Sequence, residues 1–254
     1  KLRGMMLQTN IRDYHVIYHS PGTCDRSAMP LGNGEMCVSV WCEGKDTLCI
    51  YLSRSDALTE IERTVKLGLI RLQFDNPVFF ASNFRQELSL EDGTIYVSAD
   101  SICLSIFVSR LSDALYIRGN FPHSQTVRVE YVNWRTEDGP AVEENGGVRE
   151  SADIVREEMT GTLFYHHNTD SLVPWLADLQ DLGDCKEYVP DYLKDRYFGG
   201  RMRAKFPFSR EGKWLAFKDI RELFLTVTTT AGQYPNEAAF LTALEEEEKR
   251  AANW

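Results

Sequence analysis

MPLGNGEMCVSVW, residues 29–41, combines a turn-forming sequence with an alternating apolar run. Pro30 fixes its own φ, while Gly32 and Gly34 permit backbone angles that residues with side chains resist. Asn33 tolerates the left-handed region, and its side chain readily bonds the nearby backbone. The stretch therefore predicts a tight turn that leads into a strand, and turn formation alone explains these residue types.

Similar alternating runs fill the chain from residue 14 to about residue 230. Thirteen runs rich in Val, Ile, Tyr, Phe and Thr fit period-two strands, and Gly, Asp, Asn and Pro separate them. In QELSLEDGTIYVSA, residues 86–99, Gly93 supplies the positive φ of a short hairpin loop. So many sequential hairpins predict an all-β domain of packed antiparallel sheets.

Two regions break the alternation. Residues 137–149 (EDGPAVEENGGVR) are polar and Gly-rich, which indicates an exposed loop. Residues 169–200 carry prolines and aromatic residues with little alternation, and a long connection of this kind is often functional. Its portion LVPWLADLQDLGD, residues 172–184, has room for one short helical turn.

The end of the chain has helical rather than alternating periodicity. Asn236 suits an N-cap, and an amphipathic run follows it to Trp254. The apolar stripe that needs a surface to lie against consists of Phe240, Leu244, Ala251 and Trp254. The four acids at 245–248 spread around the helix circumference, so we interpret them as a solvated face. Because the stripe reaches Trp254 without a C-cap, we expect a portion of a longer protein.

The composition excludes some partners. The net charge is −10, with 38 acidic against 28 basic residues and no dense basic run, which argues against nucleic acid. No apolar run approaches the ~18 residues of a membrane helix, so we expect no membrane partner. The six cysteines show no metal spacing, and Cys37, Cys49 and Cys103 lie in strand-like runs. They are interpreted as free buried thiols, which leaves the cellular compartment open.

Signatures of the common catalytic and cofactor sites are missing from the chain. It contains no nucleophile elbow, Walker loop, zinc signature or dinucleotide fingerprint. His166 and His167 are adjacent on a strand, so they point to opposite faces and are poorly placed to bind one metal ion. We expect one to be packed or hydrogen-bonded and the other exposed. The sequence therefore predicts no catalytic residue, no metal and no cofactor within this chain.

Several residues have both a structural and a sugar-binding interpretation. Asp56 in LSRSDA, residues 52–57, follows a predicted strand end and shares a short loop with Ser53 and Arg54. It either forms an Asx turn or charge pair, or it belongs to a carboxylate pair of a sugar site, in which about 5 to 9.5 Å separates the two groups. The tryptophans either lie in the core or stack on sugars: Trp41, Trp134, Trp175 and Trp214.

Residues 20–57 carry a family resemblance. SPGTCDRSAMPLGNGEMCVSVWCEGKDTLCIYLSRSDA resembles the β-sandwich domain that precedes the (α/α)6 barrel in glycoside hydrolases of the family 95 type. It is more similar still to a largely bacterial group of N-terminal domains called DUF5703. The shared pattern is a Pro-Leu-Gly-Asn-Gly turn, a hairpin, and a strand ending in a polar Ser/Asn-x-x-Asp loop. The segments VKLGLIRLQF and YFGGRMRAKF and the terminal helix extend the resemblance.

This resemblance implies a fold and a role. The fold is an all-β antiparallel super-sandwich of the galactose-mutarotase-like kind, with two large sheets and a C-terminal linker helix. Residues 1–235 would form the sandwich, and residues 236–254 would begin the linker toward an (α/α)6 barrel that carries the catalytic carboxylates. The expected partners are that barrel and a carbohydrate, in the periplasm or outside the cell. Fucosidase specificity is not implied, because Ser-Arg-Ser-Asp-Ala at residues 53–57 replaces the usual Asn-Glu-Asp-x-x-Trp sequence.

Two other functions remain open at this point. A free-standing carbohydrate-binding module would present at least two coplanar exposed aromatic rings on one sheet face. A complete β enzyme would place two buried carboxyl groups across a deep cleft. The candidates for a substrate cleft or an interdomain surface are Asn33, Trp41, Ser53, Asp56, Trp134, His166 and Trp175.

Overall fold

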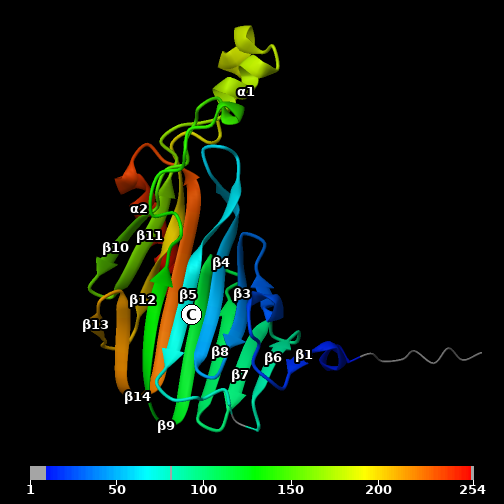
Figure 1. The fold of residues 1–254 in the computed structure, drawn as a ribbon, viewed down its shortest axis with the longest axis vertical. Coiled ribbons are helices and arrows are strands. Elements are labelled where there is room, and N and C mark those ends of the chain that lie inside the picture. The colour runs from blue at the N-terminus through cyan, green and yellow to red at the C-terminus, as the bar shows by residue number, and fades with distance from the viewer. Residues whose placement is uncertain (1–9, 81, 253–254) are drawn as a thin grey trace, which may run out of the picture.

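The computed structural model describes residues 10–80 and 82–252, apart from the side chain of Lys186. Within these residues the protein is an elongated, almost entirely antiparallel β structure (Figure 1). The strands are β1 (Val16–Tyr18), β2 (Met29–Gly32), β3 (Met36–Glu43), β4 (Thr47–Leu58), β5 (Thr64–Phe74), β6 (Arg85–Ser89), β7 (Thr94–Ala99), β8 (Ile102–Val108), β9 (Ala114–Val132), β10 (Ile154–Glu158), β11 (Gly161–His167), β12 (Arg196–Ala204), β13 (Ser209–Glu211) and β14 (Trp214–Gln233).

Helical segments are few among the described residues, and only α2 is long. The two α-helices are α1 (Val173–Leu179) and α2 (Glu237–Ala252). The 3-10 helices are η1 (Ile11–Tyr14), η2 (Asp25–Ser27), η3 (Glu143–Asn145) and η4 (Gly183–Tyr188). The prediction of an all-β domain is therefore confirmed.

The predicted hairpin around Gly93 is present. Strands β6 and β7 pair antiparallel, with Leu88 opposite Ile95 and Ser89 opposite Thr94. Gly93 has a φ of +64°, as the tight loop requires. The local sequence is sufficient to predict this hairpin because the turn and its two strands follow one another in the chain.

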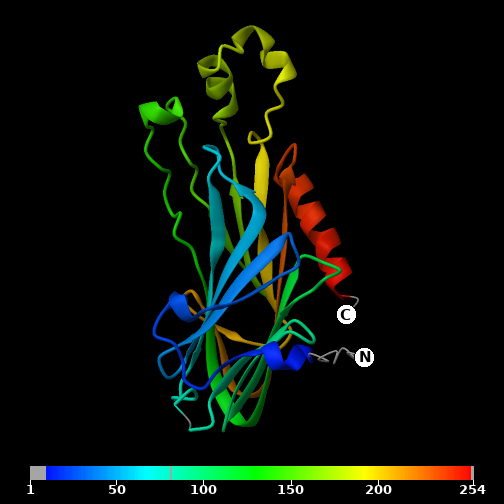
Figure 2. The same ribbon diagram turned by 90° about the vertical axis from the view of Figure 1, so that its right-hand side faces the viewer.

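All the strands belong to one hydrogen-bonded network, in which β9 and β14 join two layers. The first half of β9 pairs with β8 and its last residues pair with β5, while β14 runs along the other edge of both halves. Irregular register between Phe217 and Glu222 marks the change of layer on β14. The two layers expected from the sequence are thus continuous through these two strands (Figure 2).

The main core fills the space between the layers. Apolar side chains from β3, β4 and β5 on one layer meet those of β7, β8, β9 and β14 on the other. Four of the largest rings, Phe74, Phe79, Phe84 and Phe121, contact one another edge to face at 5.8–6.0 Å between centroids. Burial of this apolar surface is the main force that holds the layers together.

Helix α2 lies on the outer face of the second layer, against β14, β12 and β9 (Figure 2). Asn236 caps it as predicted, since its Oδ1 accepts a hydrogen bond from the Ala239 amide at 3.0 Å. Phe240, Leu244 and Ala251 are buried, which confirms the predicted stripe over these residues. Trp254, the last residue of that stripe, lies outside the described residues.

The acidic run on α2 corrects one expectation. Glu247 is buried and accepts a hydrogen bond from the Asp113 amide at 2.7 Å. Glu248 bonds Arg201 at 2.9 Å and Arg203 at 2.7 Å. Only the first two acids are exposed. The interpretation as a wholly solvated face is wrong, because the buried stripe is broad enough to turn the next two residues toward the sheet.

The cysteines are all free thiols, but not all are buried. Cys42 and Cys49 are buried, whereas Cys37 and Cys103 are exposed on outer strand faces. The expected burial of Cys37 and Cys103 is thus wrong, since alternation shows that a strand has two faces without showing which faces the core. Among the described residues, no helix is both long and apolar enough to cross a membrane.

Candidate functional site

Asn33 forms its turn through its side chain. Its Oδ1 accepts hydrogen bonds from the amides of Glu35 at 3.1 Å and Met36 at 2.8 Å. The left-handed conformation falls on Gly34, with a φ of +106°, and Asn33 keeps a negative φ. The turn is thus confirmed, but the left-handed geometry belongs to the glycine.

The other end of the Asn33 side chain reaches a distant loop. Its Nδ2 donates to the carbonyl oxygens of Ser109 at 3.0 Å and Ser112 at 3.3 Å, and to Asp113 Oδ1 at 3.1 Å. These residues lie in the β8–β9 loop, about 80 positions away. Asn33 therefore joins the β2–β3 turn of one layer to the second layer.

Arg54 is the centre of the same cluster, and its side chain is buried. It donates to Asp56 from Nε at 2.8 Å and Nη2 at 3.2 Å, and Nη1 donates to Asp113 Oδ2 at 2.7 Å and Thr229 Oγ1 at 3.0 Å. Burial acts to lower the pKa of the Arg54 guanidinium, but the hydrogen bonds to Asp56 and Asp113 raise it overall. Arg54 thus connects β4, β14 and the β8–β9 loop.

Asp56 lies within β4 rather than in a loop after it. Besides Arg54, Arg196 approaches it: Arg196 Nε donates to the Asp56 carbonyl at 2.9 Å, and its Nη2 lies 3.8 Å from Asp56 Oδ2. This arrangement is the charge pair that the sequence offered as one interpretation. Ser53 is half-buried in the same strand, next to the register irregularities that bend β4.

His166 is the centre of a second buried cluster. Its Nδ1 lies 2.9 Å from Asp153 Oδ1 and its Nε2 lies 3.0 Å from Glu60 Oε2. Burial acts to lower the pKa of His166, whereas the hydrogen bonds to Asp153 and Glu60 raise it overall. Burial likewise acts to raise the pKa of Glu60, but the His166 contact lowers it. Imidazolium and carboxylate therefore stabilise each other.

The outer atoms of this cluster are also bonded. Arg135 Nε donates to Asp153 Oδ1 at 2.9 Å, and the amides of Ser151 and Thr169 donate to Glu60 Oε1 at 3.0 and 3.3 Å. The space beside His166 is too small to admit a water molecule. His166 is buried and both its ring nitrogens are bonded, so it ties the β4–β5 hairpin to β11.

His167 points to the opposite face, as expected for neighbours on a strand. Its ring stacks on Tyr197 with centroids 4.0 Å apart and is partly exposed. Among the described residues, no group of three or more His, Cys, Asp or Glu side chains is arranged to hold a metal ion.

The tryptophans occupy separate places. Trp41 is buried, with Nε1 donating to Glu43 at 3.0 Å. Trp134 is half exposed just after β9 and meets Tyr51 at 5.8 Å with planes 60° apart. Trp175, on α1, packs against Gly146 of the 137–149 loop. Trp134 and Tyr51 are not coplanar, so they do not form the flat platform of a sugar-binding module.

The candidate residues thus form three groups rather than one cleft. Asn33 bonds Asp113 and Asp56 bonds Arg54, while Ser53 only precedes Arg54 along β4. Trp41 and Trp134 flank Tyr51 on the outer face of the first layer. His166 lies at the base of the long loops, and Trp175 lies within them.

Those long loops project from one end of the sandwich (Figure 1). Helices α1 and η4 extend beyond the strands, and the 137–149 loop rises beside them (Figure 2). The expected helical turn at residues 172–184 is confirmed and is longer, because α1 and η4 follow in succession. Large apolar side chains are exposed on this projection: Leu179, Leu182, Tyr188 and Tyr192.

A family model described as "Domain of unknown function (DUF5703)" matches residues 17–253. The chain belongs to the DUF5703 family. This confirms the resemblance carried by residues 20–57. None of the curated proteins compared with it matches.

A solved structure similar to this DUF5703 domain is that of a protein described as "Putative kojibiose phosphorylase from human microbiome". The TM-score is 0.42 at 11% sequence identity, and the similarity covers 94% of the DUF5703 chain. It covers 36% of the other chain, so the DUF5703 domain spans about a third of that protein's length.

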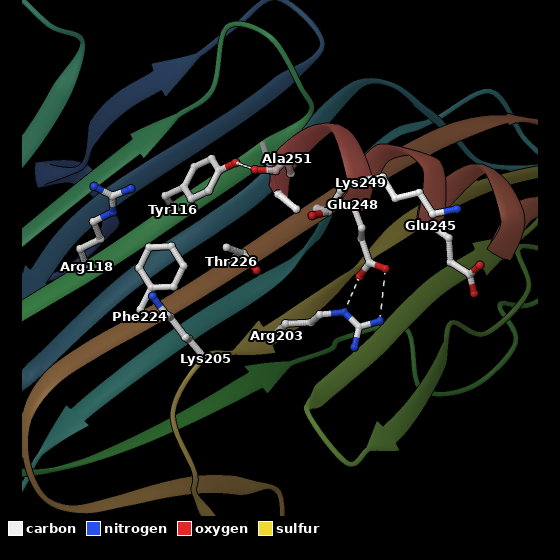
Figure 3. A pocket seen from close by; sticks show the side chains of 12 residues that line it. Tyr116, Arg118, Arg203, Lys205, Phe224, Thr226, Glu245, Glu248, Lys249 and Ala251 are labelled. Carbon is white, nitrogen blue, oxygen red and sulfur yellow. Dashed lines mark hydrogen bonds and ion pairs between the residues drawn. The ribbon is translucent and has the colours of Figure 1, made fainter. Parts of the chain in front are cut away.

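A concave surface of the DUF5703 domain lies beside α2 (Figure 3), and none of the candidate residues lines it. It has a volume of about 790 Å³ and adjoins a second hollow of about 360 Å³. Arg118, Lys205 and Phe224 line both, so the two form one groove on the outer face of the second layer. At its upper end the Tyr116 hydroxyl donates to the Ala251 carbonyl at 2.6 Å.

Sequence reasoning missed this groove and several partners in the buried clusters. Asp113, Glu60 and Asp153 lie between 13 and 106 positions from the residues they bond, so no local pattern marks them. The groove residues alternate along β9, β12 and β14, and only the pairing of these strands brings them together.

Proposed function

We propose that this chain is the non-catalytic N-terminal domain of a glycoside hydrolase. It packs on a C-terminal (α/α)6 barrel of the same polypeptide and shapes that barrel's substrate cleft, with residues 236–254 starting the linker. A periplasmic or extracellular location belongs to the same proposal. Its sequence support is the turn and hairpin of residues 20–57, shared with domains that precede such barrels.

The observation that carries the proposal is the apolar projection formed by α1 and η4. Tyr188 is 78% exposed and Leu179 is 65% exposed, and Leu182 and Tyr192 lie on the same projection. Several large apolar side chains exposed on one projection cost free energy in water and are typical of a surface that another protein surface covers. A barrel that follows in the same chain is held at high local concentration, which favours it as the occupant.

The base of the projection is rigid enough for such a role. The Glu60–His166–Asp153 cluster anchors the β4–β5 hairpin, and Asn168 Nδ2 donates to the carbonyls of Leu58 at 3.0 Å and Leu193 at 2.9 Å. Buried polar groups with satisfied partners hold one geometry, because any displacement leaves a group unpaired. Loops fixed in this way can form one side of a cleft.

The carboxylates near the candidate residues are suited to structure rather than to proton transfer. Asp56 is bonded to Arg54, and Glu60 and Asp153 are bonded to His166. A glycosidase acid needs a raised pKa, whereas the pKa of Glu60 is lowered. The proposal therefore assigns catalysis to the barrel.

The first test is the length of the natural reading frame beyond Trp254. We expect it to continue for several hundred residues in helical pairs. In that full-length protein, the double substitution Leu179→Asp and Tyr188→Asp should lower aryl glycoside hydrolysis. It should also speed hydrogen–deuterium exchange over residues 173–192, because charges would be placed in the interface. The matched control is Met159→Asp, since Met159 is 98% exposed on the β10–β11 turn.

Two results would overturn the proposal. One is ordinary turnover of aryl glycosides by residues 1–254 alone. The other is a double variant that behaves like Met159→Asp in both activity and exchange. If the reading frame ends at Trp254, the alternative is a free-standing carbohydrate-binding module. The groove beside α2 favours that alternative, and binding to a glycan array would test it.

A further inference from the structure

The groove beside α2 contains an arginine held between two aromatic rings. Arg118 on β9 lies in register with Ser105 of β8 and Phe224 of β14. Its guanidinium carbon is 5.3 Å from the centroid of Phe107 and 5.2 Å from that of Phe224. Figure 3 shows Arg118, Phe224 and Lys205 on the open face below the helix. Stacking of this kind restrains the guanidinium and leaves its in-plane N–H groups available.

Lys205 places a second cation beside the first. Its Nζ lies 5.4 Å from the centroid of the Phe224 ring. Phe224 is thus flanked by two positive groups, from β9 and from the end of β12. The rings stabilise these cations by cation–π attraction but offer no hydrogen-bond acceptor in the plane of the guanidinium.

Neither cation has a carboxylate partner, in contrast to its neighbours on the same face. Arg201 bonds Glu158 and Glu248, and Arg203 bonds Glu248. Among the residues that the structure describes, no hydrogen bond or ion pair joins the side chain of Arg118 or Lys205 to another residue. Glu222, Glu245 and Glu248 also line the groove, but none of them forms an ion pair with Arg118 or Lys205. In a chain of net charge −10, two cations over one aromatic ring without a carboxylate partner form a local site for an anion.

The size and lining of the groove define the rest of the ligand. Its larger part has a volume of about 790 Å³, within the range of small-molecule sites. Phe224 is partly exposed and offers apolar area, Tyr116 lies buried at the groove wall, and the second hollow extends the groove past Arg118. A ring with an apolar face and a carboxylate at its edge matches both features.

We propose that this groove binds an acidic saccharide, with a uronate carboxylate on Arg118 and Lys205. Arg118 supplies a bidentate pair of charge-assisted hydrogen bonds, and Lys205 supplies a third. The assignment of an anion site rests on the geometry alone. The choice of a sugar as the molecule that carries the carboxylate rests on the proposed function. The site is distinct from the α1–η4 projection, so the two can be tested separately.

Titration calorimetry with trigalacturonate tests the assignment directly. We expect saturable binding to the 254-residue protein that weakens from about 50 mM to about 500 mM salt, because exposed charges are screened. Maltotriose, a neutral trisaccharide, should bind at least about tenfold more weakly, since a charge-assisted hydrogen bond contributes about 1.5–3 kcal/mol. A hexapeptide of glutamate should also bind more weakly, because it lacks the apolar ring face.

Substitutions locate the binding to the groove. Arg118→Ala should weaken trigalacturonate binding by about tenfold or more, and Arg118→Lys should recover little of it, because lysine lacks the planar fork. Lys205→Ala should cause a smaller loss. The matched controls are Arg149→Ala and Lys194→Ala, exposed cations that line neither hollow of the groove. Near-wild-type unfolding midpoints for all four alanine variants would show that folding is intact.

Several outcomes would overturn the inference. They are the absence of trigalacturonate binding, equal binding of maltotriose, or equal losses for Arg118→Ala and Arg149→Ala. Equal binding of the glutamate peptide would overturn the saccharide assignment and leave an anion site for polypeptide. None of these results depends on the barrel. Conversely, if the Leu179 and Tyr188 substitutions had no effect, the proposed function would fail but trigalacturonate binding would remain. Failure of one proposal is therefore distinguishable from failure of the other.

Discussion

At the scale of single residues, two polar side chains, Arg54 buried and Asn33 half-buried, connect segments far apart in the sequence. Asn33 uses both ends of its amide, one for its own turn and one for the β8–β9 loop. Arg54 bonds Asp56, Asp113 and Thr229. Because buried polar groups are costly when unpaired, such contacts fix the relative position of the two layers.

Arg54→Ala should destabilise the protein by about 3–5 kcal/mol, since it leaves the Asp56 and Asp113 carboxylates without their cation. Urea unfolding followed by fluorescence measures this change. Arg63→Ala is the matched control, because Arg63 pairs with Glu150 but is exposed, and its loss should cost about 1 kcal/mol or less. Similar losses for both variants would contradict a special role for Arg54.

The His166 cluster predicts a pH dependence of stability. The pKa of His166 is raised above its unfolded value of 6.5, so its contribution to stability is complete below pH 6.5. This contribution is lost as the pH rises through the folded pKa. The pKa of Glu60 is lowered below its unfolded value of 4.5, so Glu60 stabilises the fold above pH 4.5. This contribution is lost as the pH falls through the folded pKa. The cluster therefore contributes most between pH 4.5 and 6.5.

Thermal unfolding across about pH 5 to 9 checks this dependence, with His166→Gln as the variant. Above pH 6.5 the wild-type free energy of unfolding should fall by up to about 1.4 kcal/mol per pH unit until the folded pKa is passed. The variant should have a lower free energy of unfolding overall, and that free energy should change less with pH over this range. The same slope in both proteins would show that another group titrates.

At the scale of elements, α2 is part of the folded domain as well as its last segment. Phe240 and Leu244 pack into a cluster with Leu163, Tyr165 and Tyr197 of β11 and β12. The sequence predicted this helix, its cap and its stripe as far as Ala251 correctly, because helical periodicity and capping are local properties. The surface that receives the stripe is formed by strands from several parts of the chain, so it was not predictable.

Phe240→Ala should lower the free energy of unfolding by about 3–5 kcal/mol, because it leaves a cavity between α2 and the sheet. Chemical denaturation checks this value. Glu245→Ala on the exposed side of the same helix should change stability by about 0.5 kcal/mol or less. Comparable effects of the two substitutions would indicate that α2 does not dock on the sheet in solution.

At the scale of the whole molecule, the shared strands β9 and β14 make the two layers one cooperative unit. Residues of β9 pair with β5, β8 and β14, so neither layer can separate without breaking hydrogen bonds of the other. The projection formed by α1 and η4 has only a small buried cluster of its own. Stability should therefore differ between these two parts.

Native-state hydrogen exchange checks this difference in the 254-residue protein. Amides of β9 and β14 should exchange last, with one common free energy that equals the global unfolding value. Amides of α1 should exchange much faster, because a seven-residue helix held by only a small buried cluster is marginal. Protection of α1 equal to that of β9 would contradict the division into a sandwich and a separately opening projection.

The sequence by itself determined the features that depend on neighbouring residues. The turn at Asn33, the hairpin at Gly93, the capped helix at Asn236 and the β character of the chain all follow from short-range sterics and periodicity. The tertiary structure alone decided that Asn33 and Asp56 meet at Arg54 and Asp113, and that Arg118 lies between Phe107 and Phe224. Those contacts depend on strand pairing between distant segments, and the free energy of that pairing comes from burial of the common core.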